Sequence, residues 1–238
     1  MALPLFCDDA YFLCCLLFTA VPAFAAGKLN VLQENFHVLT RYSSTYGYAY
    51  AKVENSGDRP IKVNACILEI FDENGDVLTS TDSFSSYARY LQPGEYTYVN
   101  ASDECEDVGT KDVDDYMLTI TGKNEKAYVS KRLPCTTDYK ENVAISKYNN
   151  YDYLYATVTN NTDEVVYDLT FMLALLDAEG NILYVSSTSM GSSQAICPNS
   201  SVEVRLSVPD YFEEYFALNG YTPASVDAIA YVNVAVTE

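Results

Sequence analysis

The sequence is poor in the residues on which most enzymes and nucleic-acid-binding proteins depend. It has a single histidine (His37), no tryptophan, and 14 lysine and arginine residues against 33 aspartate and glutamate residues, a net charge of −19. Such an acidic surface repels phosphate backbones and anionic headgroups, which disfavours binding to nucleic acids and membrane surfaces. The sequence also lacks phosphate-binding glycine loops, CxxC metal spacings and a recognisable nucleophile–histidine pattern. We therefore expect no enzymatic activity and no cofactor.

Long apolar runs are also missing after residue 26, so no later segment reaches the roughly 18 residues that are needed to span a bilayer. Residues 10–26 are uncharged and end near Ala23-Phe24-Ala25, a small-residue cleavage pattern. This pattern predicts a secretory signal peptide over residues 1–26. We expect the mature protein to be secreted or extracytoplasmic, without a membrane span or a covalent anchor.

The main feature of the remaining chain is an internal repeat with an offset of 105 residues. It runs without a gap from Val38/Val143 to Ser102/Ser207, and 15 of these 65 pairs are identical. In each copy an alternating strand ends at an aspartate (Asp72 or Asp177) and is followed by an acidic, glycine-containing turn, which is typical of a β-hairpin. Short strands separated by turns within about 105 residues favour a β-sandwich. The sequence therefore predicts two all-β domains, residues 27–135 and 136–238.

The turns and strands of the first repeat resemble the FxLYD-type domain of bacterial secreted and envelope proteins. The matching elements are Ala51-Lys52-Val53-Glu54-Asn55-Ser56, Leu68-Glu69-Ile70-Phe71-Asp72 with Gly75, and Leu91-Gln92-Pro93-Gly94-Glu95. The second repeat matches more loosely, with Leu176 at the aromatic position and Asn199 in place of the last glycine. The resemblance implies two tandem immunoglobulin-like sandwiches and brings no catalytic residues.

Two ladders of alternating tyrosines occupy equivalent strands of the repeat. In both strands the intervening residues are consistently apolar (Ala49, Ala51 and Val53; Leu154, Ala156 and Val158), so we place these residues inward and the tyrosines outward. Tyrosine offers a rigid apolar surface with a polar tip, which suits binding of sugars, peptides or partner domains. The alternative is ordinary cross-strand packing on a half-covered face. The candidate binding residues are Tyr46, Tyr48, Tyr50, Tyr151, Tyr153 and Tyr155.

Four cysteines follow the predicted leader. Cys66 shares strand parity with Leu68 and Ile70, so we expect a buried, reduced thiol. Cys105 and Cys135 both fall outside the gapless repeat, and we predict a disulfide between them. Cys197 has no evident partner.

Aspartates cluster between the last aligned strand of the first repeat and the strand after it. Carboxylate oxygens are ligands that Ca²⁺ prefers, but the spacing of a calcium-binding loop is absent. A solvated acidic loop is therefore the main interpretation and a calcium site the weaker one. The calcium candidates are Asp103, Asp107, Asp112 and Asp114.

The features together favour a non-catalytic interaction module that acts outside the cytoplasm on an unknown protein or glycan partner. A structural pair of domains that spaces or presents another component is the alternative, and a hydrolase is a remote one. The sequence does not identify the ligand or the oligomeric state.

Overall fold

The computed structural model describes residues 28–236 except residues 87 and 192. Strands make up 63% of the described residues and helix 5%, and all strand pairings between these residues are antiparallel. The predicted all-β sandwich fold is therefore confirmed. The predicted signal peptide lies outside the described residues. No helix of the described chain is long and apolar enough to cross a membrane.

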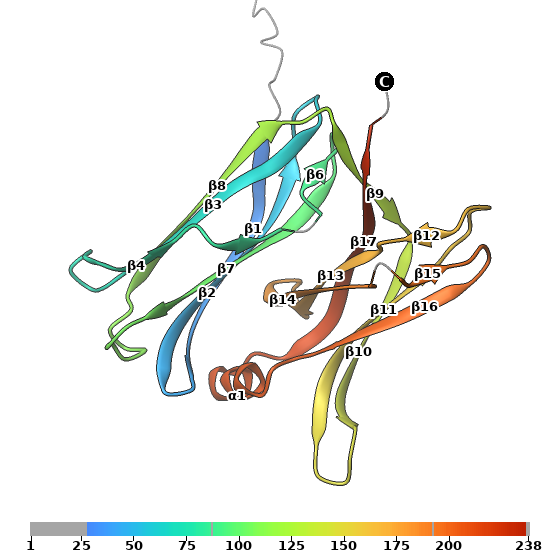
Figure 1. The fold of residues 1–238 in the computed structure, drawn as a ribbon. Coiled ribbons are helices and arrows are strands. Elements are labelled where there is room, and N and C mark those ends of the chain that lie inside the picture. The colour runs from blue at the N-terminus through green and yellow to red at the C-terminus, as the bar shows by residue number, and fades with distance from the viewer. Residues whose placement is uncertain (1–27, 87, 192, 237–238) are drawn as a thin grey trace, which may run out of the picture.

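The N-terminal half forms two sheets that pack face to face (Figure 1). Sheet 1 contains β3 at its centre, with β4 and the short β6 along one edge and β8 along the other; sheet 2 has the order β1-β2-β7-β5. The strands are β1 (Leu29–Arg41), β2 (Ser44–Asn55), β3 (Ile61–Phe71), β4 (Val77–Thr81), β5 (Phe84–Ser85), β6 (Tyr90–Leu91), β7 (Tyr96–Cys105) and β8 (Asp115–Asn124).

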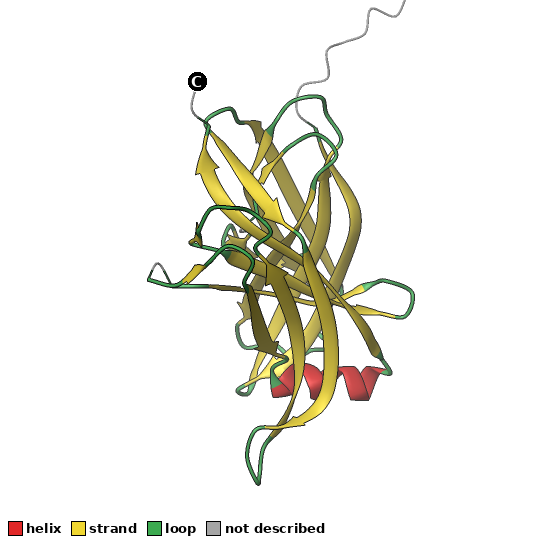
Figure 2. Ribbon diagram, turned by 90° about the vertical axis from the view of Figure 1, so that its right-hand side faces the viewer, coloured by secondary structure: helices red, strands yellow, loops and turns green. Residues whose placement is uncertain are grey.

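The C-terminal half repeats this arrangement. Sheet 3 has the order β14-β13-β17-β9, sheet 4 has the order β10-β11-β16, and β12 pairs with β15. The elements are β9 (Tyr128–Leu133), β10 (Cys135–Ala144), β11 (Asn150–Thr159), β12 (Val166–Tyr167), β13 (Thr170–Asp177), β14 (Ile182–Ser189), β15 (Ala195–Ile196), β16 (Ser201–Ser207), α1 (Asp210–Asn219) and β17 (Pro223–Ala235). Helix α1 lies at one end of the stacked sheets (Figure 2).

The residues predicted to point inward do form the two cores. Ala49, Ala51 and Val53 of β2 pack between sheets 1 and 2 with the apolar residues of β3. Their equivalents in β11 pack between sheets 3 and 4. The same buried cluster continues to Tyr48, Tyr50 and Tyr98 of sheet 2, so the four sheets form one stack in the order 1, 2, 3, 4.

The repeated turns use the same hydrogen bonds in both halves. Gly75 and Gly180 have φ angles of +79° and +85°, as hairpin turns after Asp72 and Asp177 require. Asp72 Oδ1 accepts the backbone N–H of Asn74 and Asp76, and the hydrogen bond to Asp76 is the main cause that lowers the pKa of this carboxyl. These aspartates therefore stabilise the turns.

A buried asparagine closes each repeat at the end of its tyrosine-bearing strand. Asn55 is fully buried and donates to the backbone carbonyls of Arg59 and Leu91. Asn160 donates in the same way to Glu164 and Ile196. The two asparagines, which are an identical pair of the repeat, therefore supply hydrogen bonds to buried backbone carbonyls.

Strand pairing links the two halves of the chain. β9 precedes the predicted boundary at residue 135, yet it pairs with β17 along the edge of sheet 3. Arg132 of β9 reaches back to β7, where it contacts the carbonyl of Tyr96 and lies 3.4 Å from Glu95. The division into domains at residue 135 stays a prediction.

All four cysteines of the described chain are free thiols, so the predicted Cys105–Cys135 disulfide is wrong. Cys105 ends β7 and packs in the core between sheets 1 and 2, whereas Cys135 begins β10 and its Sγ lies 3.5 Å from the carbonyl oxygen of Ala228. The repeat alignment did not reveal that both residues lie within strands of different sandwiches. Cys66 is buried and free, as predicted, and burial raises its pKa to about 12.

Gly47 provides a test of this packing, because a Cβ at this position would lie 2.4 Å from Ile70 Cδ1 and 2.9 Å from the ring of Phe36. That ring is stacked on Tyr116 at 4.2 Å and has little room to move. We expect Gly47→Ala to lower the free energy of unfolding by about 1–3 kcal/mol in urea titrations. Gly191→Ala is the control, because nothing lies within 4 Å of its Cβ position. Equal effects of the two changes would contradict the packing of β2 on β3.

Candidate functional site: two tyrosine-bearing sheet faces

The two predicted tyrosine ladders lie on equivalent faces of sheets 2 and 4, but their surroundings differ. On sheet 2, Tyr50 is fully buried and Tyr48 is 6% exposed, while Tyr46 is half-buried. The prediction that the centre of this ladder faces solvent is therefore wrong. The inward residues of β2 were placed correctly, so the cause is a second layer: sheet 3 covers the outer face of sheet 2.

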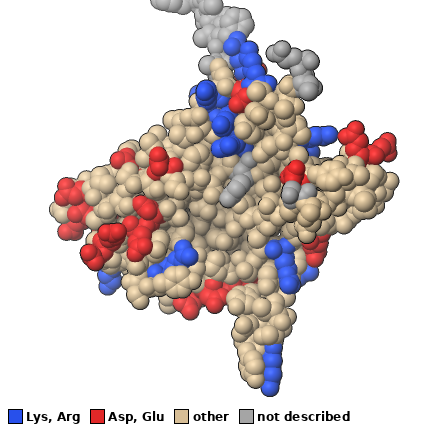
Figure 3. Space-filling model, viewed as in Figure 1, with Lys and Arg blue, Asp and Glu red and all other residues tan. Residues whose placement is uncertain are grey.

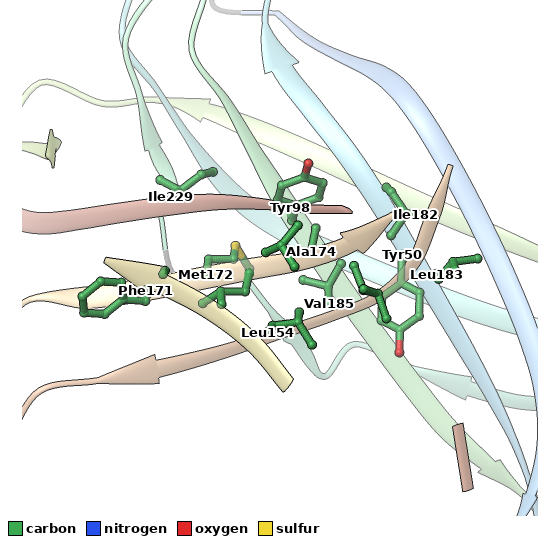
Figure 4. Close-up of a cluster of buried hydrophobic side chains, with 14 of the residues drawn as sticks. Tyr50, Tyr98, Leu154, Phe171, Met172, Ala174, Ile182, Leu183, Val185 and Ile229 are labelled. Carbon is green, nitrogen blue, oxygen red and sulfur yellow. The ribbon is translucent and has the colours of Figure 1, made fainter. Parts of the chain in front are cut away.

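The contact between sheets 2 and 3 has an apolar centre. Tyr50 and Tyr98 of sheet 2 point toward Ala174 and Val185 of sheet 3 (Figure 4). Strand β14 contacts β1, β2 and β7 and so crosses the whole face. Its backbone is held by Asn35, which donates to the carbonyl of Ile182 at 2.6 Å, and by Asn100, which donates to that of Val185 at 3.2 Å. We call this contact the internal interface.

A carboxylate supplies the polar part of the internal interface. Asp227 of β17 accepts hydrogen bonds from the hydroxyls of Tyr98 at 2.6 Å and Tyr96 at 2.9 Å, and Lys52 Nζ lies 3.3 Å away. Burial, reinforced by Asp227, raises the pKa of Tyr98 well above its ordinary value, so the hydroxyl remains a donor. These contacts join the second half of the chain to three side chains of sheet 2.

Helix α1 adds an aromatic cluster at the end of the internal interface. His37 of β1 is fully buried there, with ring centroids 5.2 Å from Tyr215 and 5.4 Å from Tyr221. Phe212 lies 4.9 Å from Tyr48 in an edge-on arrangement. Burial lowers the pKa of His37 to about 4, and a hydrogen bond with the backbone of Leu183 opposes this only in part. At neutral pH the histidine is thus an uncharged packing residue.

The ladder on sheet 4 remains at the outside of the stack. Beyond its own sheet, β11 has its main contacts with β13 and β17, which lie on its inner side. Tyr153 and Tyr155 are each 8% exposed. A cation lies over each ring: Arg205 is 4.8 Å from the ring of Tyr153, and Lys140 Nζ is 4.6 Å from that of Tyr155. Tyr151 is half-buried at the end of the row. We call this surface the sheet-4 face.

A separate cleft lies beside β9 and the short strand β12. It has a volume of about 480 Å³ and is lined by apolar side chains of β17 and β12, by Tyr167 and by Lys131 and Arg132. Arg132 is already engaged with β7, as described above. The volume lies in the range of small-ligand sites, which is about 300–1,000 Å³.

The acidic candidates do not form a metal site in the structure. Asp103 accepts a hydrogen bond from Thr79 at 2.6 Å, and Asp112 accepts one from the backbone of Gly109 at 2.7 Å. Neither these two nor Asp107 and Asp114 belong to a group of three or more potential ligands, and the described residues contain no such group. Figure 3 shows acidic side chains gathered at the end of the molecule that carries the β4 turn.

Comparisons with known proteins add little to this description. No family model and no curated protein sequence matches the chain. Among solved structures, the chain is similar to the crystal structure of red sea bream transglutaminase, with 13% sequence identity and a TM-score of 0.21. The match covers 88% of this chain and 32% of the transglutaminase, so the chain spans about a third of that protein. A likeness of this degree carries no information on activity.

Replacement of Tyr50 tests the internal interface. Because its ring is fully buried, we expect Tyr50→Ala to cost about 3–5 kcal/mol of unfolding free energy, measured by urea titration. Tyr148, which is 84% exposed, provides the matched control, and its change to alanine should stay within about 0.5 kcal/mol. A small effect at Tyr50 would mean that sheet 3 does not cover this face in solution.

His37 predicts a dependence of stability on pH. Its pKa is lower in the folded protein than in the unfolded chain, so the unfolded state binds the proton more readily. This contribution is therefore complete above about pH 6.5 and is lost as the pH falls toward about 4, by roughly 3 kcal/mol. His37→Phe keeps an aromatic ring and removes this pH-dependent contribution to stability. A pH profile that is the same for both proteins would contradict the burial of His37.

Proposed function

We propose that the protein is a non-catalytic interaction module, secreted or associated with the cell envelope, that binds a protein or glycan partner through the sheet-4 face. The observation that carries this proposal is the pair of equivalent tyrosine faces. The face on sheet 2 binds a protein surface within the chain, and the face on sheet 4 repeats Tyr48 and Tyr50 as Tyr153 and Tyr155 on the outside of the stack. A surface that buries tyrosines against one protein layer is chemically suited to bind another.

The location and the family remain part of this proposal. The leader-like residues 1–26 support export, and the resemblance to FxLYD-type domains of bacterial secreted proteins agrees with the antiparallel sandwiches. Immunoglobulin-like domains commonly serve as recognition scaffolds. A structural role as a spacer is the alternative, because the internal interface joins the two halves into one stack.

Binding to arrays of extracellular proteins and glycans tests the proposal. We expect Tyr153→Ser and Arg205→Ser to abolish binding of a probe that the parent protein retains, because both changes alter the sheet-4 face. Tyr167→Ser, in the cleft and 55% exposed, is the control and should bind normally. Circular dichroism must first show that the variants are folded.

Two results would count against the proposal. Binding that is lost in Tyr167→Ser and kept in the other variants would move the site to the cleft. A complete lack of bound probes would favour the spacer.

A further inference from the structure

The repeat makes the two ends of the sheet stack complementary to each other. Within the chain, the tyrosine face of sheet 2 packs on the outer face of sheet 3. Sheet 4 is the repeat equivalent of sheet 2, and sheet 1 is the equivalent of sheet 3. The outer faces of sheets 1 and 4 therefore correspond to the two sides of the internal interface, and they lie at opposite ends of the stack (Figure 1).

Strand register identifies the matching positions on sheet 1. In sheet 3, Met172 pairs with Ile229 and Ala174 pairs with Asp227. In sheet 1 the same positions pair Ile67 with Thr119 and Glu69 with Met117. In both sheets a carboxylate therefore pairs with an apolar residue. The carboxylate is on β17 in sheet 3 but on β3 in sheet 1.

The outer face of sheet 1 is open and partly apolar. Ile67 is 40% exposed and Met117 is 47% exposed, whereas their equivalents in sheet 3 belong to the internal interface. Half-buried Glu69 lies between them on this face. We call Ile67, Glu69 and Met117 the sheet-1 face.

The charges of the two end faces are complementary where the repeat would bring them together. Arg205 is the cross-strand neighbour of Tyr155, the equivalent of Tyr50. The equivalent of Arg205 in sheet 2 is Asn100, which donates to the backbone carbonyl of Val185 in the internal interface. Val185 pairs with Ala174, whose position in sheet 1 is taken by Glu69. Arg205 of one molecule would therefore meet Glu69 of the next, and a paired guanidinium and carboxylate supply both attraction and register.

One substitution makes this contact weaker than the internal one. Glu203 occupies the position of Tyr98, so the hydrogen bond that Tyr98 donates to Asp227 has no equivalent. The contact between molecules should accordingly be reversible and dependent on concentration.

From these observations we propose that the partner of the sheet-4 face is the sheet-1 face of a second copy of this chain. This inference rests on the proposed function and specifies its partner. The interface is heterologous, because it joins two different faces, so it propagates copies head to tail into open chains rather than closed dimers.

Sedimentation velocity of the protein expressed from the full chain tests this inference, at about 0.15 M salt to screen the net charge. We expect the parent to form a concentration-dependent series of species. Arg205→Glu alters the sheet-4 face, Met117→Asp alters the sheet-1 face, and each should weaken self-association at least about tenfold, as loss of a central contact does. Tyr167→Ser is the control and should associate like the parent.

Mixing the two blocked variants decides the geometry. The Met117→Asp protein keeps an intact sheet-4 face and the Arg205→Glu protein keeps an intact sheet-1 face, so the mixture should form one-to-one dimers that grow no further. Glu203→Tyr should strengthen association, because it restores the tyrosine of the internal interface.

Three results would overturn the inference. A parent protein that stays monomeric up to about 1 mM lacks the interface, since weaker contacts resemble crystal packing. Self-association of Met117→Asp at the parent's level would show that sheet 4 pairs with itself. Mixed variants that remain monomeric would exclude the head-to-tail contact. Array binding by the sheet-4 face is independent of these results, so the proposed function can survive the loss of this inference.

Discussion

The structure depends on the hydrogen bonds between Asp227 and the tyrosine hydroxyls of sheet 2. A tyrosine can be buried cheaply only when its hydroxyl keeps a partner, and an unmatched buried group costs about 1–3 kcal/mol. Asp227 accepts from Tyr96 and Tyr98 at once, and Lys52 balances its charge. This carboxylate thereby satisfies two of the tyrosine hydroxyls on the sheet face that becomes the inside of the molecule. Since β17 follows α1 directly, the strand that carries Asp227 and the helix that covers Tyr48 are placed together.

The two halves use the same ladder in different ways because only the second half supplies the covering elements. Helix α1 and Asp227 have no counterparts in the first half, where an acidic loop and Met117 stand instead. The ladder on sheet 4 is shielded by Arg205 and Lys140, whose chains extend over the rings while their charges remain hydrated. Such a cover can be displaced by a partner, whereas the packing of sheet 3 on sheet 2 cannot be displaced without unfolding.

Local patterns were sufficient to predict the strands, the turns and the inward face of each sandwich. The alternation at Ala49, Ala51 and Val53 predicted the inner core correctly. The contact between the two sandwiches could not be predicted from the sequence, because period-2 alternation shows which residues share a face but not what packs against that face. The sequence did not single out Asp227, because acidic residues are common throughout the chain.

The central claim is that the internal interface joins both sandwiches into one cooperative unit. Differential scanning calorimetry of the whole protein tests it most directly. If the tyrosine face of sheet 2 is buried under sheet 3, the protein unfolds in a single transition whose calorimetric and van't Hoff enthalpies agree. Two separate transitions, each with the enthalpy expected for about 100 residues, would show independent domains and would contradict this account.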